Sequence, residues 1–597
     1  FKQKTAYEIS LGLVGSEMCI RDRSTVENVE PFGDGFIAAL CPELIIFAGL
    51  LALIIIPNIG KGTFRIPGTQ TRVMWLFGGE RFKITSNPKL PAWIATITLG
   101  AAFVQTVLSF QDGVDRTAIV TESGTQLLLV NGFSRVFEMI FFGALTLAAF
   151  ASMNRLEVKG IGPKLSTDDL YNNRRQADFY ILMLTCGLGM SVVALAQDLF
   201  VLFIGLELAS FSTYVLVAFY KESKVGTEAG IKYFIVCSVA SLVGLYGLSM
   251  LYLWAGSLQF DVLAAQFVIN GTDPLPLIGI GFVLVGFGFK VSAAPFHFAA
   301  PDAYAGASSP VAGILATASK AMGIIGLIRM LLIVASPEAS EDGTVWLTLL
   351  GTISIVTMTW GNIAALGSTN PKRMLAYSSV AHAGYMLAAI TAIGAWNWDD
   401  SLAGEPGEAA VAVLTAVIFH LVVLVAFKLG AFLVLSVLES DGDASRLSSL
   451  GGLAKREPFL AVAMFVFMIS LAGVPPLAGF VSKLLVIMGI VKVAIGQMGA
   501  EIMAGGDYGL ADVHWVWWLA LAMVINSAIS MFYYLRVGVV MFFEEPEEGR
   551  TGPLPAGWQV RFAILACLMA TLFMGVASDQ LLEICEVAAK SLNYSWN

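Results

Sequence analysis

The chain has 597 residues, of which 57% are hydrophobic and only 13% are charged. An ordinary soluble domain carries about 25% charged residues, so the composition excludes a water-soluble, disordered or nucleic-acid-binding protein as the main class. The formal net charge of −9 is small for this length and indicates no basic partner surface. The six cysteines and four histidines lack the close spacings of zinc, iron–sulfur or haem sites.

Residues 1–23 (FKQKTAYEISLGLVGSEMCIRDR) share no character with the apolar chain that follows. The run is too polar for the core of a signal peptide and lacks a small-residue cleavage site. We interpret it as a non-native or disordered leader, with a native periplasmic extension as the alternative.

Apolar windows of about 20 residues recur along almost the whole remaining chain, and this is the length that a helix needs to cross a membrane. They predict an all-α polytopic membrane protein with about fourteen transmembrane helices. The transmembrane domain is expected over 36–577, with a short tail at 578–597. The windows cover 37–58, 92–110, 136–153, 177–195, 197–219, 229–254, 275–308, 310–335, 345–366, 374–395, 410–438, 458–497, 514–543 and 559–577.

Two of these windows are longer than one span and are interrupted internally. The breaks fall at 294–297 (APFH) and at 473–476 (GVPP), where proline removes a backbone donor and kinks a helix. Broken helices at corresponding places of two halves are typical of transport sites. We therefore expect two inverted five-helix repeats, over about 177–335 and 345–543, each with one broken helix.

Basic residues concentrate in alternate loops of the predicted topology. The loops at 60–91 and 154–176 are rich in Lys and Arg, whereas an intervening loop such as 396–409 is acidic. Because basic loops stay on the cytoplasmic side, the pattern predicts that both termini lie on the periplasmic side.

Several ionisable side chains interrupt the apolar windows. A charge at the bilayer centre costs roughly 2.5–3.5 kcal/mol, so such groups must face the bundle interior or water and are functional candidates. They are Glu207, Lys232, Lys290, Lys320, Lys428 and Lys483.

Some of these side chains also have a structural interpretation. Lys232 is close enough to the cytoplasmic side to snorkel, and Lys428 could simply pair with a carbonyl or an acid. A row of buried lysines bridged by histidine and water predicts a proton path, for which His297, His382 and His420 are further candidates.

Four segments carry a resemblance to a known family. Over about 36–577 the chain resembles the antiporter-like subunits of respiratory complex I, and among them the N type of bacterial NADH-quinone oxidoreductase. The short tail disfavours the L type, and Lys483 stands where the M type tends to have glutamate. The segments are KYFIVCSVASLVGLYGLSMLY at 232–252, PFHFAAPDAYAGASSPV at 295–311, KRMLAYSSVAHAGYML at 372–387 and SLAGVPPLAGFVSKLLV at 470–486.

The resemblance implies a proton-translocating subunit of an NADH:quinone oxidoreductase in a bacterial inner membrane. Protons would enter from the cytoplasm toward Lys290, pass Lys320 and leave by Lys483, while Glu207 and Lys232 tune Lys290 electrostatically.

The resemblance also implies that this chain holds no cofactor, metal or redox site. NADH, FMN, iron–sulfur clusters and quinone would belong to partner subunits. The expected partners are the other membrane subunits of the complex, the lipid bilayer and protons, with no nucleic acid.

Two other functions remain open. A Mrp-type cation/proton antiporter subunit shares the ancestry, and sodium-dependent proton exchange without NADH would distinguish it. A structural membrane spacer would have charges that are only satisfied internally, so neutralising them would lower assembly but not pumping per assembled complex.

Overall fold

The structure is a computed structural model. Among the residues that it does not describe are the leader at 1–23 and most of the loops at 60–91 and 396–409. It describes residues 27–31, 33, 35–59, 64–65, 72–73, 89–111, 117–121, 125–155, 174–270, 273–334, 344–395, 406–442, 445–503, 514–547, 552 and 554–592.

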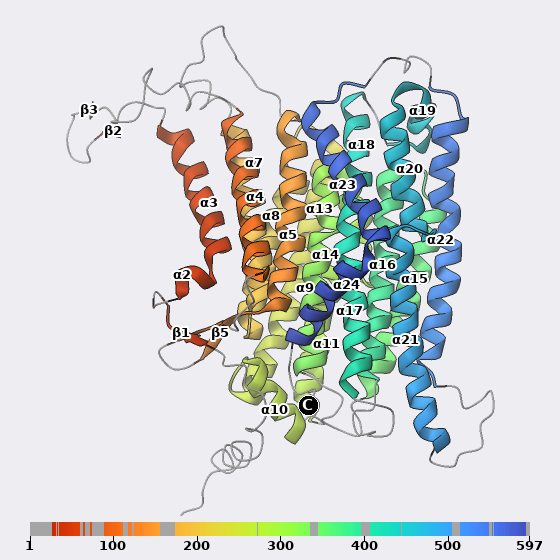
Figure 1. The fold of residues 1–597 in the computed structure, drawn as a ribbon. Helices are drawn as coiled ribbons and strands as arrows, with labels where there is room; N and C mark the ends of the chain where they lie inside the picture. The colour runs from red at the N-terminus through yellow and green to blue at the C-terminus, as the bar shows by residue number, and fades with distance from the viewer. Residues whose placement is uncertain are drawn as a thin grey trace, which may run out of the picture.

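Long helices lie side by side in one bundle that makes up most of the molecule (Figure 1). The N-terminal group is α2 (Phe36–Ala39), α3 (Cys41–Ile59), α4 (Leu90–Gln111), α5 (Gly132–Ala151) and the 3-10 turn η2 (Ser152–Asn154). The second group is α7 (Arg174–Leu195), α8 (Leu199–Val217), α9 (Lys224–Ala255), α10 (Phe260–Asn270), α11 (Pro274–Val291), α12 (Ala299–Gly306), α13 (Ser309–Ala316), α14 (Ala318–Ile328) and the π-helical turn η3 (Arg329–Val334).

The remaining helices complete the opposite half of the bundle in Figure 1. They are α15 (Thr344–Gly367), α16 (Pro371–Gly394), α17 (Pro406–Leu424), the π-helical turn η5 (Val425–Leu429), α18 (Gly430–Ser440), the 3-10 turn η6 (Leu447–Leu450), α19 (Leu453–Arg456), α20 (Pro458–Ala472), α21 (Ala478–Met503), α22 (Trp517–Phe543), α23 (Trp558–Val576) and α24 (Ser578–Ser591).

In the described part of the chain, 12 helices are long and apolar enough to cross a membrane. This confirms the prediction of an all-α multi-pass membrane protein. The two other predicted spans also form helices: α3 is a shorter apolar helix over Cys41–Ile55, and α16 is long but more polar. The two five-helix repeats stay a prediction.

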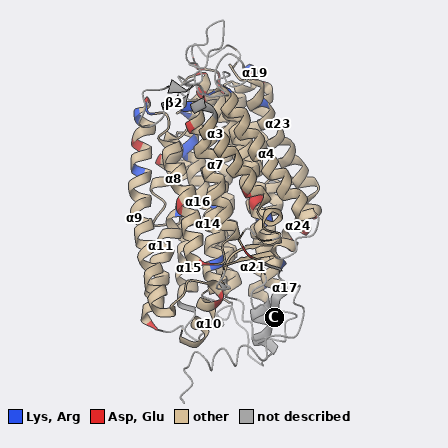
Figure 2. Cartoon of the chain, turned by 90° about the vertical axis from the view of Figure 1, so that its left-hand side faces the viewer, with Lys and Arg blue, Asp and Glu red and all other residues tan. Residues whose placement is uncertain are grey.

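The helices differ in how much of their surface the bundle covers. The apolar stretch of Ser309–Leu332 is completely buried, whereas 33% of that in Lys224–Ala255 is buried. Large apolar side chains such as Phe211, Phe234 and Leu253 are exposed on the outer helices, as suits contact with lipid. In Figure 2 most of the helical length carries neither Lys, Arg, Asp nor Glu.

Two small sheets lie beside the bundle, toward its opposite ends (Figure 1), and the sequence analysis did not predict them. In the first, β4 (Thr117–Val120) lies between the parallel strand β1 (Glu27–Val29) and the antiparallel strand β5 (Gln126–Val130). In the second, β2 (Phe64–Arg65) pairs antiparallel with β3 (Arg72–Val73).

The predicted tail begins with α24, which crosses the bundle obliquely against α5 and α17 (Figure 1). The side-chain amide of Asn131 donates to the Ser591 carbonyl at 3.0 Å, and the backbone N–H of Phe133 donates to Ser591 Oγ at 2.7 Å. The second bond satisfies an N–H at the start of α5 that has no partner within its own helix.

Both predicted helix breaks are confirmed. The first interrupts the chain between α11 and α12, and the second interrupts it between α20 and α21. At the second break Gly473 adopts φ 84, and the N–H of Val474 donates back to the Ile469 carbonyl at 3.1 Å. This left-handed turn ends α20, and glycine adopts it without the penalty that a side chain brings.

Two further irregularities were not predicted. The helix expected over 310–335 is divided at Thr317, which has φ −121 and ψ −86. The helix expected over 410–438 contains η5 in its middle, with Lys428 inside that π-helical turn. Neither position holds a proline, so the sequence carries no obvious signal. Single π-helical turns are rare and often mark functional sites.

We expect Gly473→Ala to destabilise the protein, because a side chain in the left-handed region costs roughly 1–2 kcal/mol. The new Cβ would also lie only 3.2 Å from Lys483 Cδ. The measurement is the thermal unfolding midpoint of the purified complex. Gly281→Ala in α11 is the control, because a Cβ there meets no atom within 4 Å. Equal midpoints for the two variants would contradict the expectation.

Candidate functional site

Lys320 of α14 contacts the end of the first broken helix. Its buried ammonium donates to the Val291 carbonyl at 2.9 Å and to the Ser379 carbonyl at 3.0 Å. Val291 is the last residue of α11, so the break supplies a carbonyl that no further helical turn uses. A cation is stabilised at a helix C-terminus, by up to about 2 kcal/mol in partly buried geometries.

Lys483 repeats this arrangement at the second break. Its buried ammonium donates to the Leu471 carbonyl at 2.8 Å and to the Ala472 carbonyl at 3.3 Å, at the end of α20. The ring of Tyr385 on α16 lies 5.8 Å from the same nitrogen, a cation–π distance. Both broken helices therefore end on a buried lysine.

Lys428 is the most deeply buried of these lysines. It is fully shielded from solvent and donates to Ser378 Oγ at 3.0 Å. The Ser378 hydroxyl is hydrogen-bonded in turn to the Tyr534 hydroxyl of α22. The sequence left open whether Lys428 pairs with a carbonyl or an acid. In the structure its partner is the hydroxyl of Ser378.

Two histidines extend this contact toward the second break. Tyr534 OH lies 3.4 Å from His382 Nε2, and His382 Nδ1 lies 3.0 Å from His420 Nε2. His420 Nδ1 lies 3.0 Å from the Ser482 hydroxyl, in the residue directly before Lys483. We call Lys428, Ser378, Tyr534, His382, His420 and Ser482 the lysine–histidine chain.

A small cavity lies beside the start of the lysine–histidine chain. Lys320, Ser379, His382 and Lys428 line it, together with apolar side chains such as Met386. Its volume of about 10 Å³ is close to the least space that one buried water molecule needs. The cavity therefore brings Lys320 next to the lysine–histidine chain.

Lys290 and Glu207 form a separate group on the other side of the first break. Lys290 donates to Ser210 Oγ at 2.7 Å, and Glu207 accepts from Ser241 Oγ at 2.5 Å. Glu207 and Ser210 are both on α8, one helical turn apart. Glu207 also lines an open apolar groove of about 640 Å³ with side chains such as Phe211.

The structure does not bring together Lys232 and Glu207, the two residues expected to tune Lys290 electrostatically. The Lys232 side chain is 52% exposed and pairs with Glu228 at 2.6 Å and Asp302 at 3.5 Å. Ser241, the partner of Glu207, lies nine residues further along α9, or about 13 Å at 1.5 Å per residue. The snorkelling interpretation of Lys232 fits these contacts.

His297 lies between the two halves of the first broken helix, away from the other histidines. Its ring packs edge-on against Trp360, with centroids 5.9 Å apart. Its buried Nδ1 has no hydrogen-bond partner among the residues that the structure describes. The structure therefore does not place His297 in the lysine–histidine chain.

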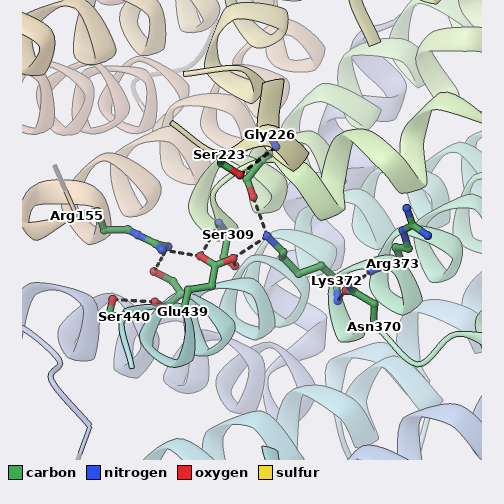
Figure 3. Close-up of polar contacts among 11 residues, drawn as sticks. Arg155, Ser223, Gly226, Ser309, Asn370, Lys372, Arg373, Glu439 and Ser440 are labelled. Carbon is green, nitrogen blue, oxygen red and sulfur yellow. Dashed lines mark hydrogen bonds and ion pairs between the residues drawn. The ribbon is translucent and has the colours of Figure 1, made fainter. Parts of the chain in front are cut away.

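A partly buried ion cluster, which the sequence analysis missed, centres on Glu439 of α18 (Figure 3). Its carboxylate pairs with Arg155 at 2.6 Å and Lys372 at 2.7 Å, and it accepts from Ser309 Oγ at 2.7 Å. Lys372 also donates to the Ala307 carbonyl at 2.8 Å. The cluster ties the turn between α12 and α13 to α16 and α18.

The sequence places Arg155 in the basic loop at 154–176 and Lys372 just before the predicted span at 374–395. Nothing in the sequence pairs them, because Glu439 is 284 and 67 positions away. The sequence contains a weak indication that Ser378 and Tyr534 belong to a polar path, since hydroxyls recur within otherwise apolar windows. The indication is weak because a lone hydroxyl in a membrane helix commonly bonds to a carbonyl of its own helix.

The described residues contain no group of three or more His, Cys, Asp and Glu side chains that could hold a metal ion. What the lysine–histidine chain offers chemically is proton transfer, because hydroxyls and neutral imidazoles both donate and accept hydrogen bonds.

Comparison with known proteins identifies the family. The family model of the NADH:quinone oxidoreductase/Mrp antiporter transmembrane region matches residues 196–405 and 407–504. NADH-quinone oxidoreductase subunit N of Heliobacterium modesticaldum is 33% identical, with 83% of this chain and 91% of that protein covered. F(420)H(2) dehydrogenase subunit N of Methanosarcina mazei is 30% identical, with coverages of 86% and 94%.

Solved structures agree with these relatives. A chain of respiratory complex I from Thermus thermophilus has a TM-score of 0.65 at 26% identity, covering 91% of this chain and 98% of that one. A chain of the Mrp complex from Dietzia sp. has a TM-score of 0.71 at 21% identity, covering 93% and 97%, which shows a shared fold only. The resemblance seen in the sequence is confirmed, and the chain belongs to the NADH:quinone oxidoreductase/Mrp antiporter family, as a membrane subunit of the N type.

Proposed function

We propose that this chain carries protons across the membrane and that quinone reduction in partner subunits drives the transfer. The observation that supports this most is the lysine–histidine chain, a continuous series of hydrogen-bonded groups inside the bundle. It starts beside Lys320 and ends next to Lys483. A static spacer would need its charges satisfied, but it would not need a series of groups that each donate and accept.

A proton moves along this chain by successive exchange. The Lys428 ammonium gives a proton to Ser378, whose own hydroxyl hydrogen passes to Tyr534. The Tyr534 hydrogen passes to His382 Nε2, and the hydrogen on His382 Nδ1 passes to His420 Nε2. One proton has then moved from Lys428 in η5 to His420, which becomes an imidazolium beside Ser482, and Lys428 is left as a neutral amine.

The expected direction follows from the positions of the other lysines. Protons enter from the side of the basic loops toward Lys290, reach Lys320 and Lys428, and leave past Lys483. Glu207 acts on Lys290 through the turn of α8 that carries Ser210. By the positive-inside rule the entry side is the cytoplasm, and both termini lie on the periplasmic side of a bacterial inner membrane.

Redox chemistry belongs in this proposal to partner subunits, which would carry FMN, the iron–sulfur clusters and the NADH and quinone sites. The relatives support this assignment, because they are named as subunits of NADH-quinone oxidoreductase and F(420)H(2) dehydrogenase. The second candidate function is that of a Mrp-type antiporter subunit, because the matched family model covers both kinds of subunit. Sodium-dependent proton exchange without any electron donor would support that candidate instead.

We expect Tyr534→Phe to interrupt the lysine–histidine chain, because it removes the hydroxyl between Ser378 and His382. Proton uptake into membrane vesicles should fall at least about tenfold, since a positioned proton donor contributes roughly 100-fold or more. Tyr304→Phe is the matched control, because the buried Tyr304 hydroxyl donates to the Leu315 carbonyl outside the chain, at 2.8 Å. Equal proton uptake in the two variants would show that the hydroxyl at 534 carries no protons.

We expect Lys290→Ala to lower NADH–quinone oxidation and proton uptake together, because a coupled enzyme cannot turn over when its proton path is closed. Both rates are measured in the same vesicles, with assembly checked on a native gel. Lys590→Ala is the control, since Lys590 is an exposed lysine of α24 paired with Glu586 at 2.6 Å. Normal pumping by an assembled Lys290→Ala complex would refute the proposal.

A further inference from the structure

A second group of ionisable side chains lies apart from the lysines, between α3, α5 and α7. Glu43 is on α3, Arg135 and Glu138 are on α5, and Ser191 is on α7. Glu43 is 7% exposed, and the other three are at most 1% exposed. The group lies near the end of the bundle that carries the three-stranded sheet, where α3 and α5 begin (Figure 1).

These side chains make a short series of polar contacts. Arg135 donates through Nη1 to Glu138 Oε2 at 2.6 Å and through Nη2 to the Ala39 carbonyl at 2.5 Å. Ser191 Oγ lies 2.5 Å from Glu43 Oε1 and 3.0 Å from Glu138 Oε1. The other oxygen of Glu43 is buried without a hydrogen-bond partner in the described structure.

The hydrogen count of these contacts requires an additional proton. A serine hydroxyl has one hydrogen, so Ser191 can donate to only one of its two carboxyl neighbours and must accept from the other. A carboxyl group donates only when it is protonated. The charges of the group also require this proton. Arg135 compensates one carboxylate, and a second carboxylate would be buried without a counter-charge.

We propose that Glu43, Ser191 and Glu138 form a proton-binding site that holds one proton between two carboxyl groups. Glu138 touches Arg135 directly and is therefore the carboxylate. Glu43 is the acid: its O–H donates to Ser191 Oγ, and the Ser191 hydroxyl donates to Glu138.

The site can pass its proton without changing its net charge. When Glu43 gives its hydrogen to the Ser191 oxygen, Ser191 gives its own hydrogen to Glu138, and Glu43 becomes the carboxylate. The ligand is a proton rather than a metal cation, because 2.5 Å between two oxygens is a hydrogen-bond separation that leaves no room for an ion between them.

Few other charged groups face this site. Cys41 on α3 lies close enough to act electrostatically on Arg135. Arg329 of η3 binds the Val193 and Ala196 carbonyls at the end of α7. The helix α4, which packs against α3, α5 and α7, carries no titratable side chain at all. The protonation of the site therefore depends on its own four side chains. It is independent of the proposed route through the lysines.

The first test is the infrared absorption of protonated carboxyl groups in the purified complex. We expect Glu43→Gln to remove one such band, and this band should shift in heavy water in the unaltered complex. Glu222→Gln is the matched control, because its hydrogen bonds to Arg175 lower the pKa of exposed Glu222 to about 2, so it carries no proton at neutral pH. A Glu43→Gln complex that keeps every protonated-carboxyl band would overturn the proposal.

The second test uses the other carboxyl group. In Glu138→Gln the remaining carboxyl, Glu43, becomes the only carboxyl group that can compensate the charge of Arg135 and should lose its proton, so the same single band disappears. Ser191→Ala is the mildest change and covers the case in which a glutamine variant does not assemble. It should keep the band but shift it to higher frequency, because the bridging hydrogen bond is lost. An unshifted band in Ser191→Ala would contradict a shared proton.

Discussion

Every polar group inside a membrane must find its partner within the protein, and the two broken helices show how this chain meets that requirement. A helix that stops in the bilayer leaves carbonyl groups without a donor. Here Lys320 takes the last carbonyl of α11, and Lys483 takes the last two of α20. Each break and its lysine satisfy one another, so neither can be changed alone without leaving a buried polar group unpaired.

Backbone irregularities also gather around the buried cations. Thr317 divides a helix one turn before Lys320, and the π-helical turn η5 contains Lys428. At the other end of that region, Arg329 lies in η3 and donates to carbonyls at the end of α7. The acceptors of the two lysines lie on other helices, because Lys320 donates to carbonyls of α11 and α16 and Lys428 donates to a hydroxyl of α16.

Charged groups thus occur in three settings with different consequences. Glu439 is paired with both Arg155 and Lys372, and these ion pairs hold the helices together. Along the lysine–histidine chain, cations meet hydroxyls and imidazoles, so protons can move. At Glu43 and Glu138 two carboxyl groups share one arginine, and this imbalance makes a proton a necessary part of the structure.

The sequence by itself determined the membrane class, the positions of the spans, both helix breaks and the set of deep lysines. These features are local: a window of apolar residues, a proline or a lone charge can be read without knowing its neighbours. Only the tertiary structure decided the partners. In the structure Lys428 is linked to Tyr534 through Ser378, and Glu43 is linked to Glu138 through Ser191. Lys232 lies at the surface beside Asp302, and His297 lies outside the lysine–histidine chain. Those partners lie on helices that are distant in sequence, and hydropathy places a residue within the membrane but does not fix the direction in which its side chain points.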